Sequence, residues 1–231
     1  MTSPDDMNFS GAAIRVNVAN EPASWVHADR KGAPGTYSFT MSKLLKPGQV
    51  GKFAIEKATI SRGTVTDGYD IRRGKMDQIS YDVDYPVVKL TENGNTWMSD
   101  NPFEVESSMG AIESARGDVL IGGLGIGLLP TLMKDKVDSI DIVELNQEVI
   151  NLVFHQVATE KMKIIQDDIC HYLTATEKRY DFICVDIWPD TFLPLWDIIG
   201  MKELARRCLK PGGDIWCWLQ ELYHAPDDDM K

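Results

Sequence analysis

The chain has 231 residues, which is enough for one large domain or for an α/β domain with a small second unit. Its net charge is −11 and its isoelectric point is about 4.8, so the surface repels phosphates and disfavours DNA or RNA as a partner. The four cysteines are scattered without a Cys-x-x-Cys pair, which excludes a disulfide frame or a zinc site of that type.

The amino terminus, MTSPDDMNFS, has neither a basic end nor an apolar core, so we do not expect a signal peptide. No apolar run approaches the length that crosses a bilayer. We therefore predict a cytoplasmic protein without a membrane partner, in which Cys170, Cys184, Cys208 and Cys217 are buried, reduced thiols.

The amino-terminal part is predicted to be loop and antiparallel β-structure. Residues 1–36 are rich in Gly, Pro, Ala, Asn and Asp, with one alternating stretch at 14–18 that predicts a strand. Residues 37–100 form a small β region, in which the Asp-Gly and Asn-Gly dipeptides at 67–68 and 93–94 are typical of hairpin turns.

Two features modify this outline. Pro86 predicts an edge strand or a break, because proline cannot donate to a strand ladder. Asn101, Pro102 and Glu104 predict a helix start, with Asn as the cap, Pro in the first turn and Glu bonding back to the cap amide. We expect this helix to end at Gly117.

From residue 118 onward, strands alternate with helices, which predicts a parallel sheet with right-handed crossovers. The fold class is therefore α/β, a Rossmann-like doubly wound sheet without the full closing hairpin. We predict three parts, a loop-rich segment 1–36, a β region 37–100 and a ligand-binding domain 101–231. The expected strands cover 119–121, 140–144, 162–166, 180–187 and 214–219, and the longer expected helices cover 146–161, 169–177 and 197–209.

A glycine-rich turn follows the first of these strands. Gly122, Gly123, Gly125 and Gly127 allow a sharp bend and a close approach of ligand atoms to the backbone. Glu144 ends the next strand, 21 positions after Gly123, where a carboxylate suits the hydroxyls of a ribose. The pattern is G-x-G-x-G and not the G-x-G-x-x-G of dinucleotide folds.

Two further acids follow later strands. Asp168 and Asp186 stand at strand ends, where ligands bind in open α/β sheets. Simpler structural roles are open for each: Asp168 as the cap of the next helix, Asp186 as a cap or turn residue, and Glu144 as a solvated strand end.

Four stretches together resemble a known superfamily. IGGLGIG, DIVELNQEVI, IIQDDICHYL and YDFICVDIWPD, followed by LKPGG, resemble class I S-adenosylmethionine-dependent methyltransferases, and most closely the catalytic domain of spermidine synthases. The resemblance covers nearly half of the chain. It implies S-adenosylmethionine, or its decarboxylated form, as the cofactor.

The resemblance also implies roles for individual residues. The glycines would hold the amino acid part of the cofactor, the acid at 144 the ribose hydroxyls, the acid at 168 the adenine amino group, and the isoleucine beside it the ring. The implied cofactor-binding set is Gly122, Gly123, Gly125, Gly127, Glu144, Asp168 and Ile169. Asp186 would face the sulfonium and the nucleophile as the catalytic residue, with Trp188 and Asp190 at the substrate; no metal is expected.

The chain departs from the spermidine synthase pattern in three places. Gly125 stands where those enzymes have Asp, and SDNPFE at 99–104 stands in place of their Tyr-His-Glu segment. The second acid of their Asp-Ser-x-Asp-Pro motif is shifted by one position, to Asp190.

Three functions therefore remain open. The first is an S-adenosylmethionine-dependent methyltransferase acting on a small or medium-sized, cationic acceptor. The alternative is a spermidine synthase-like aminopropyltransferase, and the second alternative is a non-catalytic protein that binds an adenosyl ligand. The partner is a small-molecule substrate in the first two, and a homodimer formed through the β region is one arrangement, as in similar aminopropyltransferases.

Overall fold

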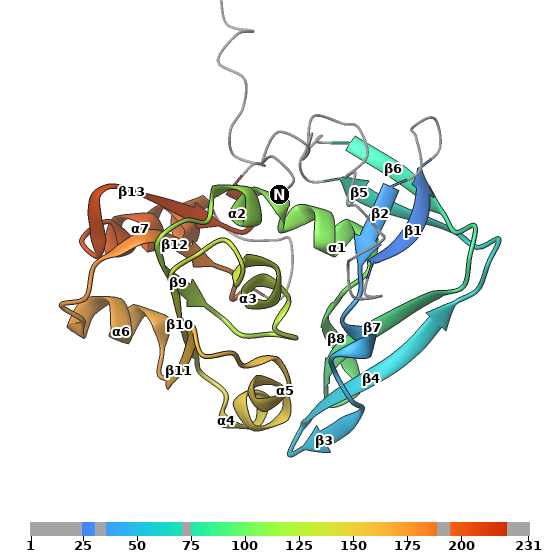
Figure 1. The fold of residues 1–231 in the computed structure, drawn as a ribbon, viewed down its shortest axis with the longest axis horizontal. Coiled ribbons are helices and arrows are strands. Elements are labelled where there is room, and N and C mark those ends of the chain that lie inside the picture. Colours follow the sequence, from blue (N-terminus) through green and yellow to red (C-terminus); the bar gives the residue numbers. More distant parts are fainter. Residues whose placement is uncertain (1–24, 31–35, 71–74, 189–194, 221–231) are drawn as a thin grey trace, which may run out of the picture.

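The computed structural model describes residues 25–30, 36–70, 75–188 and 195–220. Antiparallel strands and an α/β unit lie side by side, with helix α1 between them (Figure 1). The strand expected at 14–18 and the candidate residue Asp190 lie outside the described residues.

The antiparallel part contains two four-stranded sheets, with the orders β2-β1-β6-β5 and β3-β4-β7-β8. Backbone pairing within each sheet is antiparallel. The elements are β1 (Trp25–Arg30), β2 (Thr36–Phe39), a 3₁₀ turn (Met41–Lys43), β3 (Gly48–Val50), β4 (Phe53–Ile60), β5 (Val65–Asp70), β6 (Lys75–Ser80), β7 (Tyr85–Glu92) and β8 (Asn95–Ser99).

One of the two predicted hairpin turns is confirmed. Asn93 and Gly94 have positive φ values of 51° and 80° and join β7 to β8. The turn predicted at 67–68 is wrong, because both residues lie inside β5 and pair with β6. Gly68 is needed there for packing: a Cβ atom would lie 2.5 Å from the Phe103 Cε2 atom of α1.

The edge position predicted from Pro86 is also wrong, since β7 lies between β4 and β8. Pro86 is near the start of β7 and faces Thr59 of β4, while the pairing with β8 begins only at Lys89. Its missing N–H therefore interrupts no hydrogen bond on the β8 side.

The helix predicted from 101 to 117 is divided into α1 (Pro102–Ser107) and α2 (Met109–Ser114). Asn101 caps α1 as predicted, because its side-chain oxygen accepts from the Phe103 and Glu104 amides at 2.9 and 3.3 Å. The Glu104 carboxylate bonds elsewhere than predicted: it accepts from the Ser99 amide at 2.6 Å, the Ser99 hydroxyl at 2.8 Å and the Asn101 Nδ2 atom at 2.6 Å. It thereby joins the helix start to the end of β8.

The α/β part is a five-stranded parallel sheet with the order β11-β10-β9-β12-β13. The predicted Rossmann-like class is confirmed, and the order reverses at β9, which has β10 on one side and β12 on the other. The strands are β9 (Asp118–Gly122), β10 (Ser139–Glu144), β11 (Met162–Gln166), β12 (Tyr180–Val185) and β13 (Leu209–Cys217).

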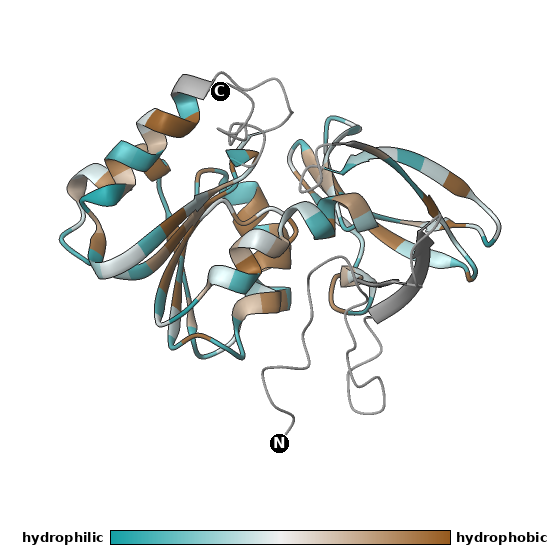
Figure 2. Ribbon diagram, turned by 90° about the horizontal axis from the view of Figure 1, so that it is seen from above, coloured by the Kyte–Doolittle hydropathy of each residue, from teal (hydrophilic) through white to brown (hydrophobic). Residues whose placement is uncertain are grey.

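Helices cover both faces of this sheet (Figure 2). Alternate strand residues supply the two cores: Ile121 and Ile142 pack on the side of α2 and α3, and Leu120 and Val143 pack on the side of α6 and α7. The helices are α3 (Leu128–Met133), α4 (Gln147–Val149) continued by a π-helical segment η3 (Ile150–Phe154) and α5 (His155–Val157), α6 (Ile169–Ala175) and α7 (Leu195–Arg206).

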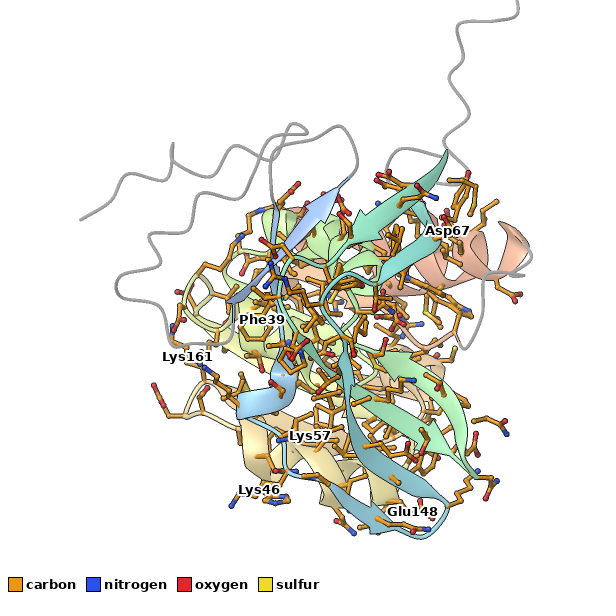
Figure 3. All side chains as sticks on the ribbon, turned by 90° about the vertical axis from the view of Figure 1, so that its right-hand side faces the viewer. Phe39, Lys46, Lys57, Asp67, Glu148 and Lys161 are labelled. Atoms are coloured by element: carbon orange, nitrogen blue, oxygen red, sulfur yellow. The ribbon has the colours of Figure 1, made fainter. Side chains whose placement is uncertain are left out.

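The β3–β4 hairpin touches the helical run of residues 147–157. The Lys46 amide donates to the Gln156 Oε1 atom at 2.8 Å, and a Cβ atom at Gly51 would lie 3.1 Å from Glu148 (Figure 3). These contacts pack the antiparallel part against the helical run that follows β10.

The thiol prediction is confirmed for three cysteines and wrong for the fourth, since Cys170 is exposed in the first turn of α6. Within the residues that the structure describes, no helix is both long and apolar enough to span a bilayer.

Candidate active site

A cavity of about 630 Å³ lies where the two parts of the molecule meet. Gly123, Glu144, Asp168 and Asp186 line it from the carboxyl ends of β9, β10, β11 and β12. The opposite wall comes from the antiparallel part and consists of Phe53, Tyr69, Leu90, Trp97 and Met98.

The four predicted glycines have different positions. Gly123 and Gly125 line the cavity and have φ values of 96° and 52°. Gly127 has a φ of 74°, begins α3 and packs against Val157, 3.0 Å from where its Cβ would lie. Gly122 closes β9 and is similarly close to Ile169. Neither Gly122 nor Gly127 is among the described lining residues, so their role is in the packing of the turn against the rest of the domain.

A methionine of the opposite wall rests on this turn. The Ile126 amide donates to the Met98 Sδ atom at 3.3 Å, and a Cβ atom on residue 125 would overlap the same sulfur. Glycine at 125 is therefore required both by the positive φ and by the approach of β8. No local pattern in the sequence signals this contact.

Glu144 is 7% exposed and holds the turn to β10. Its Oε2 atom accepts from the Leu124 amide at 2.9 Å, and its Oε1 atom accepts from the Asn146 amide at 2.8 Å. The Oε1 atom also accepts from the Asn146 Nδ2 atom at 3.4 Å, and because each carboxylate oxygen can accept two hydrogen bonds, the group retains capacity for one further donor at Oε2.

Asp168 has the capping role that the sequence left open. Its Oδ1 atom accepts from the Cys170 and His171 amides at 2.8 and 3.2 Å, at the start of α6. Ile169 is buried beside it and lines the cavity. Asp167 also lines the cavity, a position that sequence reasoning missed, and its carboxylate contacts the His171 Nδ1 atom at 2.8 Å.

Asp186 stands directly after β12, and its amide donates to the Gly122 carbonyl at 2.9 Å. Asp186 lines the cavity, and burial raises the pKa of its carboxyl group to about 7, with a further contribution from the negative charge of Glu104. A carboxyl group with such a pKa exchanges a proton near neutral pH.

Glu104 is the second acid on this side of the cavity, and sequence reasoning did not identify it. Burial raises the pKa of its carboxyl group, while the hydrogen bonds from Ser99 oppose that shift. The sequence pattern explained Glu104 fully as part of a helix cap, so nothing in it indicated that the side chain reaches a cavity.

Aromatic residues line the same cavity as these two acids. Phe103 and Trp188 line the cavity, and Trp188 also packs partly against the core beneath α6 and α7. Trp218 lines it as well and is held by a hydrogen bond from its Nε1 atom to the Ser107 hydroxyl at 3.1 Å. Carboxylates beside ring faces form a surface that attracts organic cations.

Comparison with known proteins agrees with this architecture. The family model of the spermine/spermidine synthase domain matches residues 106–221, just over half of the 231 residues. The chain belongs to the spermine/spermidine synthase family. A search of curated proteins finds no match.

Solved structures that match this chain have low sequence identity to it. A complex of DhpI with S-adenosylhomocysteine is 19% identical with a TM-score of 0.41, over 50% of this chain and 57% of that one. The N-methyltransferase NodS from Bradyrhizobium japonicum is 17% identical with a TM-score of 0.42, over 51% and 68%. The glycopeptide N-methyltransferase MtfA, bound to S-adenosylmethionine, is 22% identical with a TM-score of 0.38, over 48% and 51%.

Proposed function

We propose that this protein is an alkyltransferase that binds an adenosyl sulfonium compound in the cavity and moves its aminopropyl group to an amine. The observation that supports this most directly is that Glu104 and Asp186 line one cavity with aromatic residues and the glycine turn, and that the charge of Glu104 acts on Asp186. Family membership supports the same reaction class.

The residues at the rim fit an adenosyl group. Gly123 brings backbone to the cavity without a side chain of its own, Glu144 retains one acceptor position for a ribose hydroxyl, and Ile169 offers an apolar contact for a purine ring. The Asp168 carboxylate caps α6 and also accepts a hydrogen bond from the adenine amino group. We assign the adenosyl subsite to these residues.

The charge of the lining favours the decarboxylated form of the cofactor. Five acids line the cavity, namely Glu104, Glu144, Asp167, Asp168 and Asp186. Decarboxylated S-adenosylmethionine carries a sulfonium and an ammonium, whereas the intact compound adds a carboxylate that these acids repel. The same charge favours a cationic acceptor, held with a contribution from the Trp188 ring.

When bound, the sulfonium compound supplies an electrophilic carbon whose bond to sulfur breaks as the amine attacks, leaving methylthioadenosine. Asp186 receives the proton that the amine nitrogen releases, because its pKa of about 7 lets it exchange a proton at working pH. Glu104 binds an ammonium group of the acceptor and orients the acceptor toward Asp186. The protein's main contribution is alignment of the two reactants.

Methyl transfer to a small cationic acceptor is the second candidate function. Gly125 and the segment 99–104 favour it, since both depart from the spermidine synthase pattern. We further propose the division into parts 1–36, 37–100 and 101–231, and a homodimer through the antiparallel part.

Product analysis separates these functions. The purified protein is incubated with each form of the cofactor and a panel of mono-, di- and polyamines, and adenosyl products are measured by chromatography. Aminopropyl transfer yields methylthioadenosine, whereas methyl transfer yields S-adenosylhomocysteine. Binding of both cofactors without either product contradicts a catalytic role and favours the non-catalytic alternative.

A further inference from the structure

We propose that Met98 determines cofactor specificity, by covering the Ile126 amide so that the site selects adenosyl sulfonium ligands without an α-carboxylate. The inference rests on the proposed function and assigns part of its selectivity to one side chain of the antiparallel part. This contact with the glycine turn is a source of selectivity separate from the negative charge of the cavity.

The position of the sulfur carries the argument. Met98 lines the cavity and comes from β8, on the wall opposite the parallel sheet. Its Sδ atom lies 3.3 Å from the Ile126 nitrogen and accepts that N–H. It also occupies the space beside Gly125 that a side chain at this position would fill. Met98 is therefore seated on the turn and does not merely pass near it.

Covering this amide affects one ligand more than the other. A carboxylate gains most from backbone N–H donors, because hydrogen bonds to charged acceptors are the strong ones. To reach the Ile126 N–H, a carboxylate must displace the Met98 sulfur. A ligand that ends in an ammonium gains nothing from an N–H donor, so the sulfur costs it no contact.

The test compares three ligands in four proteins. Calorimetry gives the affinities of S-adenosylmethionine, its decarboxylated form and methylthioadenosine for the wild type and for Met98→Ala, Met98→Leu and Met76→Ala. Methylthioadenosine has no amino acid tail and reports whether the adenosyl subsite is intact. Met76 is a 65% exposed methionine that is not among the lining residues and serves as the matched control.

We expect Met98→Ala to shift the affinity ratio toward S-adenosylmethionine by about tenfold or more, the effect of one hydrogen bond to a charged group. Met98→Leu keeps the amide covered and should keep the ratio, as should Met76→Ala. Binding of methylthioadenosine should be unchanged in all variants.

Two results overturn the inference while leaving the proposed function in place. One is an unchanged ratio in Met98→Ala with methylthioadenosine still bound, and the other is a ratio that shifts equally in Met76→Ala. If the wild type binds none of the three ligands, the proposed function itself fails, and the inference fails with it. If Met98→Ala is the only protein that loses methylthioadenosine binding, the inference about Met98 is also contradicted, because Met98 would then support the adenosyl subsite.

Discussion

Asp186→Asn should make the protein more stable at pH 8 while abolishing transfer. The change preserves the shape of the side chain and removes its charge. The folded-state pKa of Asp186 is about 7, raised from an ordinary value of 3.8, so folding favours the protonated form. The associated stability is complete below about pH 4 and is lost as the pH rises through about 7.

The size of the effect follows from the shift. One pKa unit corresponds to about 1.4 kcal/mol, so a shift from 3.8 to about 7 costs the wild type about 4 kcal/mol once the group is ionised. Contact with water in the cavity screens part of this cost, so we expect a gain of roughly 2–4 kcal/mol for Asp186→Asn at pH 8. For a chain of this length the gain raises the melting temperature by roughly 5–15 °C.

Urea and thermal unfolding at about pH 5.5, 6.5 and 8 measure the gain, which should roughly double across this range. Asp181→Asn, on the strand that leads to Asp186, is the control. Lys210 lowers the pKa of Asp181 through a 2.7 Å contact, so its contribution has the opposite sign: present at neutral pH and lost as the pH falls through its lowered pKa. If the stability change from Asp186→Asn does not depend on pH, or if the variant is less stable than the wild type at pH 8, Asp186 is not a buried carboxyl group whose ionisation destabilises the fold.

Three further substitutions test the cavity and the fold. Glu144→Ala should weaken methylthioadenosine binding by about 1.5–3 kcal/mol, and unchanged affinity by calorimetry would refute the ribose role. Gly125→Ala should lower the free energy of unfolding by about 1–2 kcal/mol in urea titrations, and by less in a Met98→Ala background, whereas equal losses would show that the sulfur does not touch the turn. Gly68→Ala should lower the free energy of unfolding by about 1–3 kcal/mol, because the new methyl group meets the Phe103 ring of α1. Gly200→Ala, in open space on α7, should raise it by up to about 1 kcal/mol. A Gly68→Ala variant with unchanged stability would contradict the packing role.

The rim of the parallel sheet could be predicted from sequence because one topological rule determines it. Carboxyl ends of neighbouring parallel strands meet at one edge, so residues far apart in the chain must be close there. Gly123, Glu144, Asp168 and Asp186 all follow this rule, and all four line the cavity. Their chemical roles do not follow from the rule and remain proposals.

The opposite wall could not be predicted, because it depends on how two separately folded layers pack. Met98 follows a hairpin turn and has no pattern that connects it to residue 125. Gly68 is a second case in which the sequence pattern did not predict the structure. Asp-Gly is a strong local turn signal, but contact with Phe103 decides its place within a strand, so a tertiary contact overrides a local preference.

Glu104 and Asp186 line the same cavity but have different surroundings, and this difference suggests two roles. Glu104 accepts three hydrogen bonds, from the Ser99 amide and hydroxyl and from the Asn101 amide group, and each of them favours its charged form. Burial and the charge of Glu104 both favour the protonated form of Asp186. Burial raises the pKa of both acids, but hydrogen bonds oppose the shift at Glu104 and nothing opposes it at Asp186, so we assign the fixed charge to Glu104 and the proton exchange to Asp186. Glu104→Gln should therefore weaken amine binding and also lower the pKa seen in the pH profile of kcat/KM. A profile that does not move would contradict the coupling of the two groups.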